Sequence, residues 1–137
     1  MWWYQDKEFT DDQIGENIGF VYIIKNLKTG KLYIGKKVFT FKKVKRPKKG
    51  KKNRQHSRIP SNWSNYYGSN KILLEDVESL GKEKFKRTIL HLCRTKGIAS
   101  YLEATEIIQN NALIDDNFYN EYLLMRVSKS HLRQLIT

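Results

Sequence analysis

The sequence predicts an α/β fold of the α+β kind, in which helices flank a small antiparallel β-sheet. Two apolar runs of strand length, 20–25 and 31–35, lie on either side of turn-forming residues, which is typical of a β-hairpin. Residues 69–81 show the apolar spacing of a helix. The chain has 137 residues, 39% of them hydrophobic, which is enough for one modest core. A single folded domain is therefore expected.

The register of the hairpin decides whether two tyrosines lie on the same face. If Lys25 pairs with Gly30 around a four-residue turn, Tyr22 lies directly opposite Tyr33. A slip of one residue would place the two rings on opposite faces of the sheet. Gly30 can adopt the positive φ that such a turn often needs. We therefore expect the register that pairs Tyr22 with Tyr33.

Two helices and one more strand are expected after residue 60. Ser69 or Asn70 caps the first helix and Gly81 ends it. Its apolar face consists of Ile72, Leu73, Val77 and Leu80. Residues 84–92 predict a strand with Phe85, Ile89 and Leu90 to pack. Residues 100–111 predict the second helix, which packs Leu102, Thr105 and either Ile107 or Ile108.

The remaining segments are expected to surround this core. Residues 1–18 form an arm that packs Trp2, Trp3 or Phe9 onto the domain. Residues 42–60 are too charged to bury and too rich in Lys, Pro and Gly for a helix, so they predict a mobile insertion that orders on its partner. Residues 115–137 are expected to mix helix and tail, with Tyr119 and Leu123 packed back.

Charge is the strongest compositional signal. The formal net charge is +12, and sixteen of the 26 Lys and Arg residues lie between Asn17 and Leu74, a stretch without Asp or Glu. Such a basic region favours a polyanionic partner, and DNA is the partner we expect. A nuclear-localisation-like tract at 45–52, or simple solvation, is the alternative. The expected DNA contacts are Lys37, Lys42, Lys43, Lys45, Arg46, Lys48, Lys49, Lys51, Lys52, Arg54 and Lys71, with Trp63 and Tyr67 as stacking platforms.

Several classes of protein are disfavoured. Cys93 is the one cysteine, so the sequence offers no disulfide partner and no pair of thiolates for a metal. The three histidines do not have the spacing of a zinc site or of a His-Asn-His nuclease. The sequence has neither a signal-peptide pattern nor an apolar run of about 18 residues. We therefore expect no membrane partner and a cytoplasmic protein, in the host cytoplasm if the gene is phage-encoded.

The two tyrosine segments carry a resemblance to a known family. Tyr22 and Tyr33 are eleven residues apart, and the second segment reads Tyr33-Ile34-Gly35. The order that follows also matches, with a helix, a strand, Leu102-Glu103 and Tyr119-Asn120. The chain resembles the GIY-YIG endonucleases and looks closest to small stand-alone phage members. Its first motif is Phe-Val-Tyr, with Gly19 one residue before the nominal glycine position.

The resemblance implies a division of the chain and a set of roles. Residues 19–120 form the nuclease domain with a basic insertion at 42–60, residues 1–18 form the arm, and residues 121–137 form a tail or helix. Tyr22 and Tyr33 position or deprotonate the attacking water, and Glu103 holds a single Mg²⁺ (or Mn²⁺). Asn120 braces the site.

An arginine is implied at the scissile phosphate. Family members usually carry it where this chain has Lys43, so Arg46, Arg54 and Arg58 are candidates, and Arg58 is preferred because the family pattern resumes just after it. Lys36 or Lys37 can share this role. A phenol also needs nearby positive charge to lower its pKa, which Lys31, Lys36 and Lys37 are placed to supply.

Local sequence also allows structural interpretations. Tyr22 fits ordinary strand packing, and Trp63 fits a small aromatic core beneath the helix. Ser100 and Glu103 match a capping box, in which the carboxylate only reaches back to the Ser100 amide. Glu106, one turn later, is a substitute for Glu103 as metal ligand.

The expected function is hydrolysis of DNA phosphodiester bonds with a divalent metal. A non-catalytic nucleic-acid-binding module on the same scaffold is the alternative, and a basic protein of a ribonucleoprotein is the third interpretation. Residues 121–137 are too few for a second DNA-reading domain. Sequence specificity must therefore come from the insertion, the N-terminal arm or a homodimer.

Overall fold

A five-stranded sheet with strand order β2-β1-β7-β3-β4 lies at the centre of the computed structural model, which describes residues 1–45, 55–124 and 126–136. Its strands are β1 (Trp2–Tyr4), β2 (Lys7–Phe9), β3 (Gly19–Asn26), β4 (Leu32–Val38) and β7 (Phe85–Cys93). A separate two-stranded ribbon contains β5 (Thr40–Lys45) and β6 (Gln55–Pro60). The helices are α1 (Lys71–Leu80), α2 (Lys96–Gln109) and α3 (Arg133–Ile136), with short 3-10 helices at Asp11–Gln13, Trp63–Asn65, Lys82–Lys84 and Lys129–Leu132.

The α+β fold class is confirmed, although the sheet is mixed rather than wholly antiparallel. Strand β1 pairs with β7 in parallel, while the other neighbouring strands of the sheet are antiparallel. The expected arm supplies both N-terminal strands: β1 and β2 form a hairpin whose turn residues Gln5 and Asp6 have positive φ. Trp2 and Phe9 are buried, so this segment packs aromatic side chains onto the domain as expected.

The register of the β3–β4 hairpin differs from the expected one by two residues. Lys25 pairs with Leu32 rather than with Gly30, so Tyr22 lies opposite Gly35 and not opposite Tyr33. The turn is longer because the Asn26 side chain accepts hydrogen bonds from the backbone N–H groups of residues 28 and 29. A shift of two residues preserves the face, so Tyr22 and Tyr33 still share one side of the sheet.

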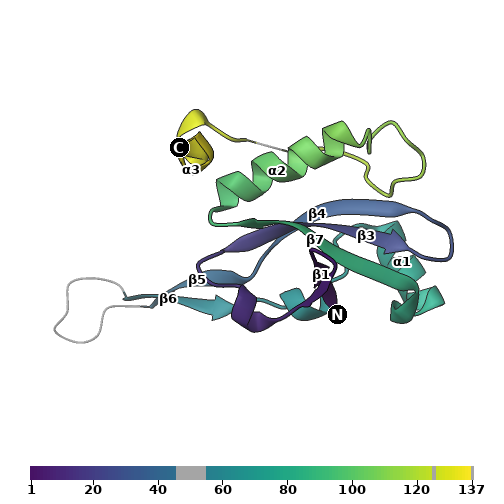
Figure 1. Cartoon of the computed structure of the whole chain (residues 1–137), viewed down its shortest axis with the longest axis horizontal. Helices are drawn as coiled ribbons and strands as arrows, with labels where there is room; N and C mark the ends of the chain where they lie inside the picture. The colour runs from purple at the N-terminus through teal and green to yellow at the C-terminus, as the bar shows by residue number, and fades with distance from the viewer. Residues whose placement is uncertain (46–54, 125, 137) are drawn as a thin grey trace.

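Each face of the sheet has its own core, and Figure 1 shows α2 on one side of the sheet and α1 on the other. Helix α2 covers one face, where Val21 and Ile34 pack with apolar residues of that helix. Segment 61–70 and helix α1 cover the other face, where Phe20, Tyr22 and Leu73 are buried. Within the described residues, no helix is both long and apolar enough to cross a membrane.

The helices largely follow their sequence signals. Asn70 caps α1 by accepting a hydrogen bond from the Leu73 N–H, and Gly81 ends the helix, as expected. The expected inward position of Ile72 was wrong, because this side chain is 49% exposed. Helix α2 begins at Lys96 with Thr95 as its N-cap. Ser100 therefore lies inside the helix, and the capping-box interpretation of Ser100 and Glu103 was wrong.

The C-terminal part packs back as expected. Tyr119 is buried, and Leu123 packs against the core beneath α2. Of the two candidate residues near the end of α2, Ile107 faces the core and Ile108 is exposed.

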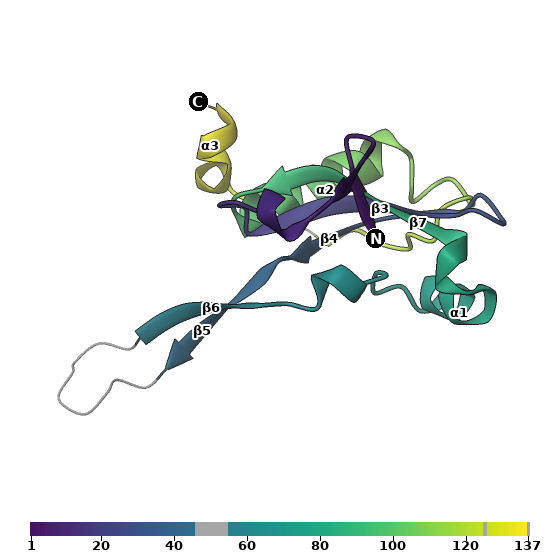
Figure 2. The same ribbon diagram turned by 60° about the horizontal axis from the view of Figure 1, so that its bottom comes forward.

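The basic insertion is not irregular throughout. Residues 40–45 pair with residues 55–60 as an antiparallel ribbon, in the register Phe41 to Ile59 and Lys42 to Arg58. This ribbon extends away from the sheet in both views (Figures 1 and 2). Residues 42–45 and 55–60 therefore form strands, which the expected mobile insertion did not include. Residues 46–54, and with them the expected contacts at Arg46, Lys48, Lys49, Lys51, Lys52 and Arg54, lie outside the described residues.

Trp63 belongs to the core rather than to a stacking platform. It is 8% exposed and packs edge-on against Phe9, Phe20 and Phe39. The Trp2 indole N–H donates a hydrogen bond to the Trp63 carbonyl at 2.9 Å. The expected role of Trp63 in stacking on bases is thus contradicted, because its ring faces other aromatic rings.

We predict that Trp63→Ala lowers the free energy of unfolding by about 3–5 kcal/mol, because it leaves a large cavity among these rings. Urea unfolding measures the change. Trp3→Ala is the matched control: Trp3 is only half-buried, so its loss should destabilise the protein clearly less. Equal destabilisation by both substitutions would contradict this account of the core.

Candidate active site

A pocket of about 360 Å³ lies at the free edge of β4. It brings together five of the six residues expected to act in catalysis, which are Tyr22, Tyr33, Lys36, Glu103 and Asn120. The pocket is completed by Ile34, Ser69, Asn70, Lys71, Ile107, Glu121, Tyr122 and Leu124.

The position of β4 at the edge explains how side chains from both faces of the sheet meet. Tyr33 points to the face that holds Tyr22, whereas Ile34 packs beneath α2. Lys36 points to the same face of the sheet as Ile34, because side chains alternate between the two faces along a strand. Among the described residues, no further strand of the sheet pairs along this edge, so the pocket can collect groups from either side of β4.

Gly35 allows the Tyr22 side chain to reach this pocket. A β-carbon at Gly35 would lie 2.3 Å from the Tyr22 hydroxyl and 2.6 Å from its Cζ atom. The phenol therefore passes directly over the glycine, which stands opposite it in the register. The rings of Tyr22 and Tyr33 are 6.2 Å apart between centroids.

A β-bulge lies beside Tyr22. Along β3 and β7, Val21 pairs with His91 and Tyr22 pairs with Ile89, so Leu90 is the additional residue on β7. Bulges of this kind turn a strand locally and are frequent near active sites. This bulge lies beside Tyr22, the residue of β3 whose side chain lines the pocket.

The phenols are harder to ionise than free tyrosine. Burial raises the pKa of Tyr22 well above its ordinary value, and the nearby Tyr66, Tyr33 and Glu103 raise it further. Burial also raises the pKa of Tyr33, against a lowering contribution from its hydrogen bond with Ser69 at 3.3 Å. The expectation that flanking lysines lower these pKa values was wrong, because burial is the largest contribution to both pKa shifts and raises both values. Both phenols are therefore protonated hydrogen-bond donors at neutral pH.

Glu103 is half-buried on α2 and faces the same pocket. Burial raises the pKa of its carboxyl group, and the charge of Lys36 opposes that shift. The Lys36 ammonium donates a hydrogen bond to the Ser100 hydroxyl at 2.6 Å, one helical turn before Glu103. Helix α2 thus positions both the carboxylate and the lysine.

Asn120 braces the β4 edge through the backbone. Its side chain accepts a hydrogen bond from the Ile34 N–H at 3.0 Å and donates one to the Ile34 carbonyl at 2.8 Å. Just before it, the backbone of Leu32 exchanges hydrogen bonds with Asn117 and Tyr119. The Asn120 side chain therefore makes the two hydrogen bonds with the Ile34 backbone that a neighbouring strand would otherwise make.

Tyr119 extends this brace into the core. Its hydroxyl donates to Asp76 on α1 at 2.6 Å and accepts from the buried Asn26 at 3.0 Å. The Asn70 side chain donates to the Tyr119 carbonyl at 2.8 Å. Sequence reasoning missed this network, since each residue alone reads as an ordinary cap or turn residue.

Arg58 does not reach the pocket. It lies on β6, where its guanidinium donates to the Thr40 hydroxyl at 2.6 Å and to the Thr40 carbonyl at 3.0 Å. The described residues that line the pocket include no arginine. Lys71, at the first turn of α1, and Lys36 are its cations.

Arg87 is the arginine that sequence reasoning missed. It is 3% exposed, donates to the carbonyls of Ser64 and Tyr66, and lies over the rings of Trp2 and Tyr67. This contact covers one face of Tyr67, which argues against its expected use as a stacking platform. Arg87 holds segment 64–67 against the sheet, beside Tyr22, and is not among the residues that line the pocket. Its inward position on β7, between Phe85 and Ile89, was the signal available in the sequence.

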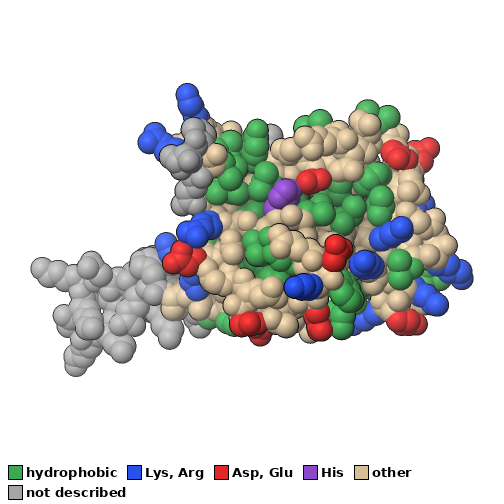
Figure 3. All heavy atoms as spheres, viewed as in Figure 1, with side chains coloured by type: hydrophobic (Ala, Val, Ile, Leu, Met, Phe, Trp, Pro, Cys, Tyr) green, Lys and Arg blue, Asp and Glu red, His purple; other side chains and the backbone are tan. Residues whose placement is uncertain are grey.

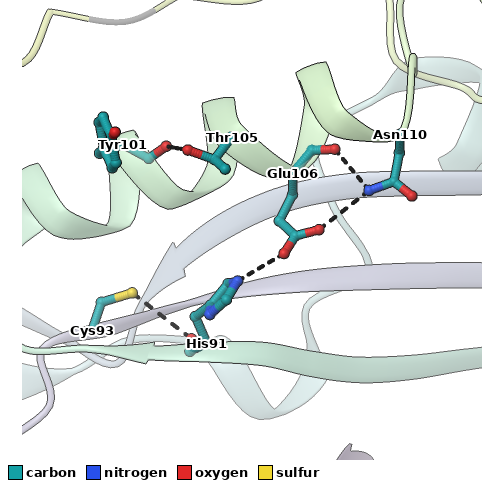
Figure 4. A network of polar contacts seen from close by, with 6 residues as sticks. All are labelled: His91, Cys93, Tyr101, Thr105, Glu106 and Asn110. Atoms are coloured by element: carbon teal, nitrogen blue, oxygen red, sulfur yellow. Dashed lines mark hydrogen bonds and ion pairs between the residues drawn. The ribbon is translucent and has the colours of Figure 1, made fainter.

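Glu106 does not substitute for Glu103. Figure 4 shows its carboxylate turned towards β7, where it meets His91 Nε2 at 2.8 Å. Asn110 donates to the Glu106 carbonyl and, at 3.2 Å, to its carboxylate. Glu106 therefore fastens α2 to β7 and is not among the residues that line the pocket.

The other expected DNA contacts are distributed unevenly. Lys42 is exposed on the ribbon, and Lys43 and Lys45 lie on the same strand. Lys37 is half-buried, with its ammonium 4.2 Å from the centre of the Tyr66 ring, and desolvation lowers its pKa. On the face of the molecule in Figure 3, acidic and basic side chains are interspersed.

Comparison with known proteins identifies the class. Residues 2–123 match the sequence profile of a family described as "Putative endonuclease segE, GIY-YIG domain". The chain therefore belongs to the GIY-YIG endonuclease family. Searches of curated proteins and of solved structures found no match.

The donor set of the pocket fits a hard divalent cation with few protein ligands. No group of three or more His, Cys, Asp or Glu side chains suited to a metal occurs in the described part of the chain. Mg²⁺ commonly binds one or two carboxylates, keeps several waters and takes its other ligands from substrate phosphates. Glu103, with Glu121 also on the pocket wall, matches that pattern.

We predict that Gly35→Ala lowers endonuclease activity by about 100-fold, because the new methyl group displaces the Tyr22 phenol and small misplacements are costly in catalysis. Gly30→Ala is the control: its φ is +82° with open space around it, so the change costs about 1 kcal/mol of stability and spares activity. Initial cleavage rates of the two folded variants test this. Wild-type activity of Gly35→Ala would contradict the proposed path of the phenol.

Proposed function

We propose that this chain hydrolyses DNA phosphodiester bonds in the pocket at the β4 edge, with a divalent metal held by Glu103. The observation that carries the proposal is that tyrosine, glutamate and lysine side chains meet in one pocket of a GIY-YIG fold, among them Tyr22, Tyr33, Glu103, Lys36 and Lys71. The charge supports a polyanionic substrate, since no Asp or Glu occurs between Asn17 and Leu74.

Hydrolysis needs a water oxygen to bond to phosphorus and release a proton to solvent, while the bond to one sugar oxygen breaks and that oxygen takes up a proton. Negative charge grows on the phosphoryl oxygens during this step, so hydrogen-bond donors and cations around them accelerate it. Tyr22 and Tyr33 are protonated, so they donate hydrogen bonds to the phosphate or to the attacking water. Their proposed role is to position these groups rather than to remove a proton.

Lys36 and Lys71 are proposed to neutralise the phosphate. They line the pocket from β4 and from the start of α1, so they approach a bound phosphate from different elements. A lysine supplies a point charge without the two-pronged geometry of arginine, and two lysines partly offset that difference. Ser100 holds Lys36 in place.

Glu103, assisted by Glu121, would hold Mg²⁺ or Mn²⁺. The ion would supply positive charge and Lewis acidity at the phosphate. Lys36 keeps Glu103 closer to its ionised form than burial alone would allow, which favours binding of a cation.

We predict that Glu103→Gln abolishes nicking and linearisation of supercoiled plasmid in Mg²⁺, lowering the rate at least 100-fold, because the amide keeps the shape but loses the charge that holds the cation. Agarose-gel time courses measure the rates. Glu106→Gln is the matched control on the same helix and should retain activity, because its carboxylate contacts His91 instead of the pocket.

Equal nicking by wild type and Glu103→Gln would overturn the assignment of Glu103. Binding of DNA without any cleavage by wild type, with Mg²⁺ or Mn²⁺, would favour a non-catalytic binding module on this scaffold.

We predict that Lys71→Ala lowers the cleavage rate at least 10-fold and that Lys71→Arg restores most of it, because the pocket needs a cation at the start of α1. Lys82→Ala, beyond the other end of α1, should leave the rate within about twofold, as expected for one exposed charge. Single-turnover rates with saturating protein separate this effect from weaker binding. A rate for Lys71→Ala equal to that of Lys82→Ala would exclude a role for Lys71 in the step.

A further inference from the structure

The β5–β6 ribbon has a rigid root. Phe39, between β4 and β5, is fully buried, and its N–H donates to the Ile18 carbonyl at 2.7 Å. Ser61, just after β6, donates through its N–H to the Phe39 carbonyl and through its hydroxyl to the Val38 carbonyl at 2.6 Å. The two strands therefore leave the body of the protein in a fixed direction, as Figures 1 and 2 show.

Beyond this root, the side chains of the ribbon that the structure describes are largely exposed. The side chains of Phe41, Lys42 and residues 57–60 are exposed, although Phe41 and Ile59 are large and apolar. A two-stranded ribbon alone is only marginally stable in water. Its exposed faces are therefore available to a partner.

The charges on one face of the ribbon indicate that this partner is an anion. Lys42 and Arg58 stand directly opposite each other in the antiparallel register. Like charges in this position repel, and the nearest acidic residues in sequence are Glu16 and Glu75. Thr40 holds the Arg58 guanidinium with two hydrogen bonds, so this side chain is ordered before any partner binds.

The shape of the ribbon selects one groove of a DNA duplex. The major groove is about 12 Å wide and admits a two-stranded ribbon, whereas the minor groove is only about 6 Å wide. Lys36, on the pocket wall, and Thr40, at the start of the ribbon, are four residues apart. At roughly 3.3 Å per residue they are at most ~13 Å apart, or about four base pairs of duplex. One duplex can therefore occupy both places.

We propose that the β5–β6 ribbon docks in the major groove of the same duplex whose phosphodiester enters the pocket, with Lys42 and Arg58 contacting phosphates or base edges. Arg58 thus serves in substrate recognition, away from the reacting atoms. The proposal rests on the proposed function only in taking duplex DNA as the substrate.

The experiment measures binding of a fluorescein-labelled 30-base-pair duplex by anisotropy in EDTA, where cleavage plays no part. The double substitution Lys42→Ala and Arg58→Ala is compared with Lys28→Ala and Lys84→Ala, which remove the same charge near the β3–β4 turn. We expect the ribbon variant to bind about 10-fold more weakly or worse, with a salt slope shallower by up to two, and the control variant to bind like wild type. Unchanged thermal unfolding confirms that both variants are folded.

Competition with ligands that bind one groove of DNA is a second test of the same complex. Methyl green, which occupies the major groove, should compete with the wild-type protein, whereas netropsin in the minor groove should not. Equal weakening by the two double variants, or competition by netropsin alone, would overturn the proposal. If the ribbon effect is seen but Mg²⁺ produces no cleavage, the proposed hydrolysis fails while the docking surface stands.

Discussion

The passage of the Tyr22 phenol over Gly35 is the contact on which the arrangement of the pocket depends. A side chain from the interior strand β3 reaches the sheet edge because its neighbour on β4 has no β-carbon. Tyr33, two residues earlier on β4, then lies beside it on the same face. The Tyr33-Ile34-Gly35 segment thus supplies one tyrosine of the pocket, one core residue and the glycine over which the Tyr22 phenol passes.

An open strand edge is costly, because it leaves backbone groups unpaired and invites association. Here the edge of β4 forms part of the pocket instead of pairing with another strand of the sheet. Asn120 satisfies both backbone groups of Ile34, and Tyr119 links that contact to Asp76 and Asn26. Groups from both faces of the sheet can consequently meet in one place, while the edge itself remains hydrogen-bonded. Asn120 and Asn70, which belong to this network, also line the pocket.

Helix α2 is held in register from two sides. Glu106 contacts His91 on β7, and Ser100 accepts a hydrogen bond from Lys36 on β4. Glu103 lies between these two attachments on the helix. The position of Glu103 relative to the phenols is therefore determined by contacts that do not involve its carboxylate.

Much of this arrangement was predictable from the sequence, and the failures have physical causes. The shared face of Tyr22 and Tyr33 follows from the period of two in a strand, so it survived an error of two residues in the turn. The opposition of Tyr22 and Gly35 was not predictable, because the Asn26 side chain extends the turn by local hydrogen bonds. Glu103 looked like a capping residue until Thr95 proved to be the cap of α2.

Contacts between residues far apart in the sequence were the other features that could not be predicted. Arg58 was expected at the phosphate from its place in the sequence, but pairing of β5 with β6 carries it away from the pocket. The alternation along β7 indicated that Arg87 points inward, but its carbonyl partners at residues 64 and 66 could not be predicted from local sequence. The catalytic roles of the pocket residues remain predictions.

The most direct test of the central claim is a crystal structure of the protein with a duplex oligonucleotide and Ca²⁺, an ion that commonly occupies magnesium sites without supporting hydrolysis. The account predicts one phosphate in the pocket at the β4 edge, within hydrogen-bond distance of Tyr33 and close to Lys36 and Lys71, with the cation on Glu103. A duplex bound elsewhere, with the pocket free of phosphate and cation, would contradict it.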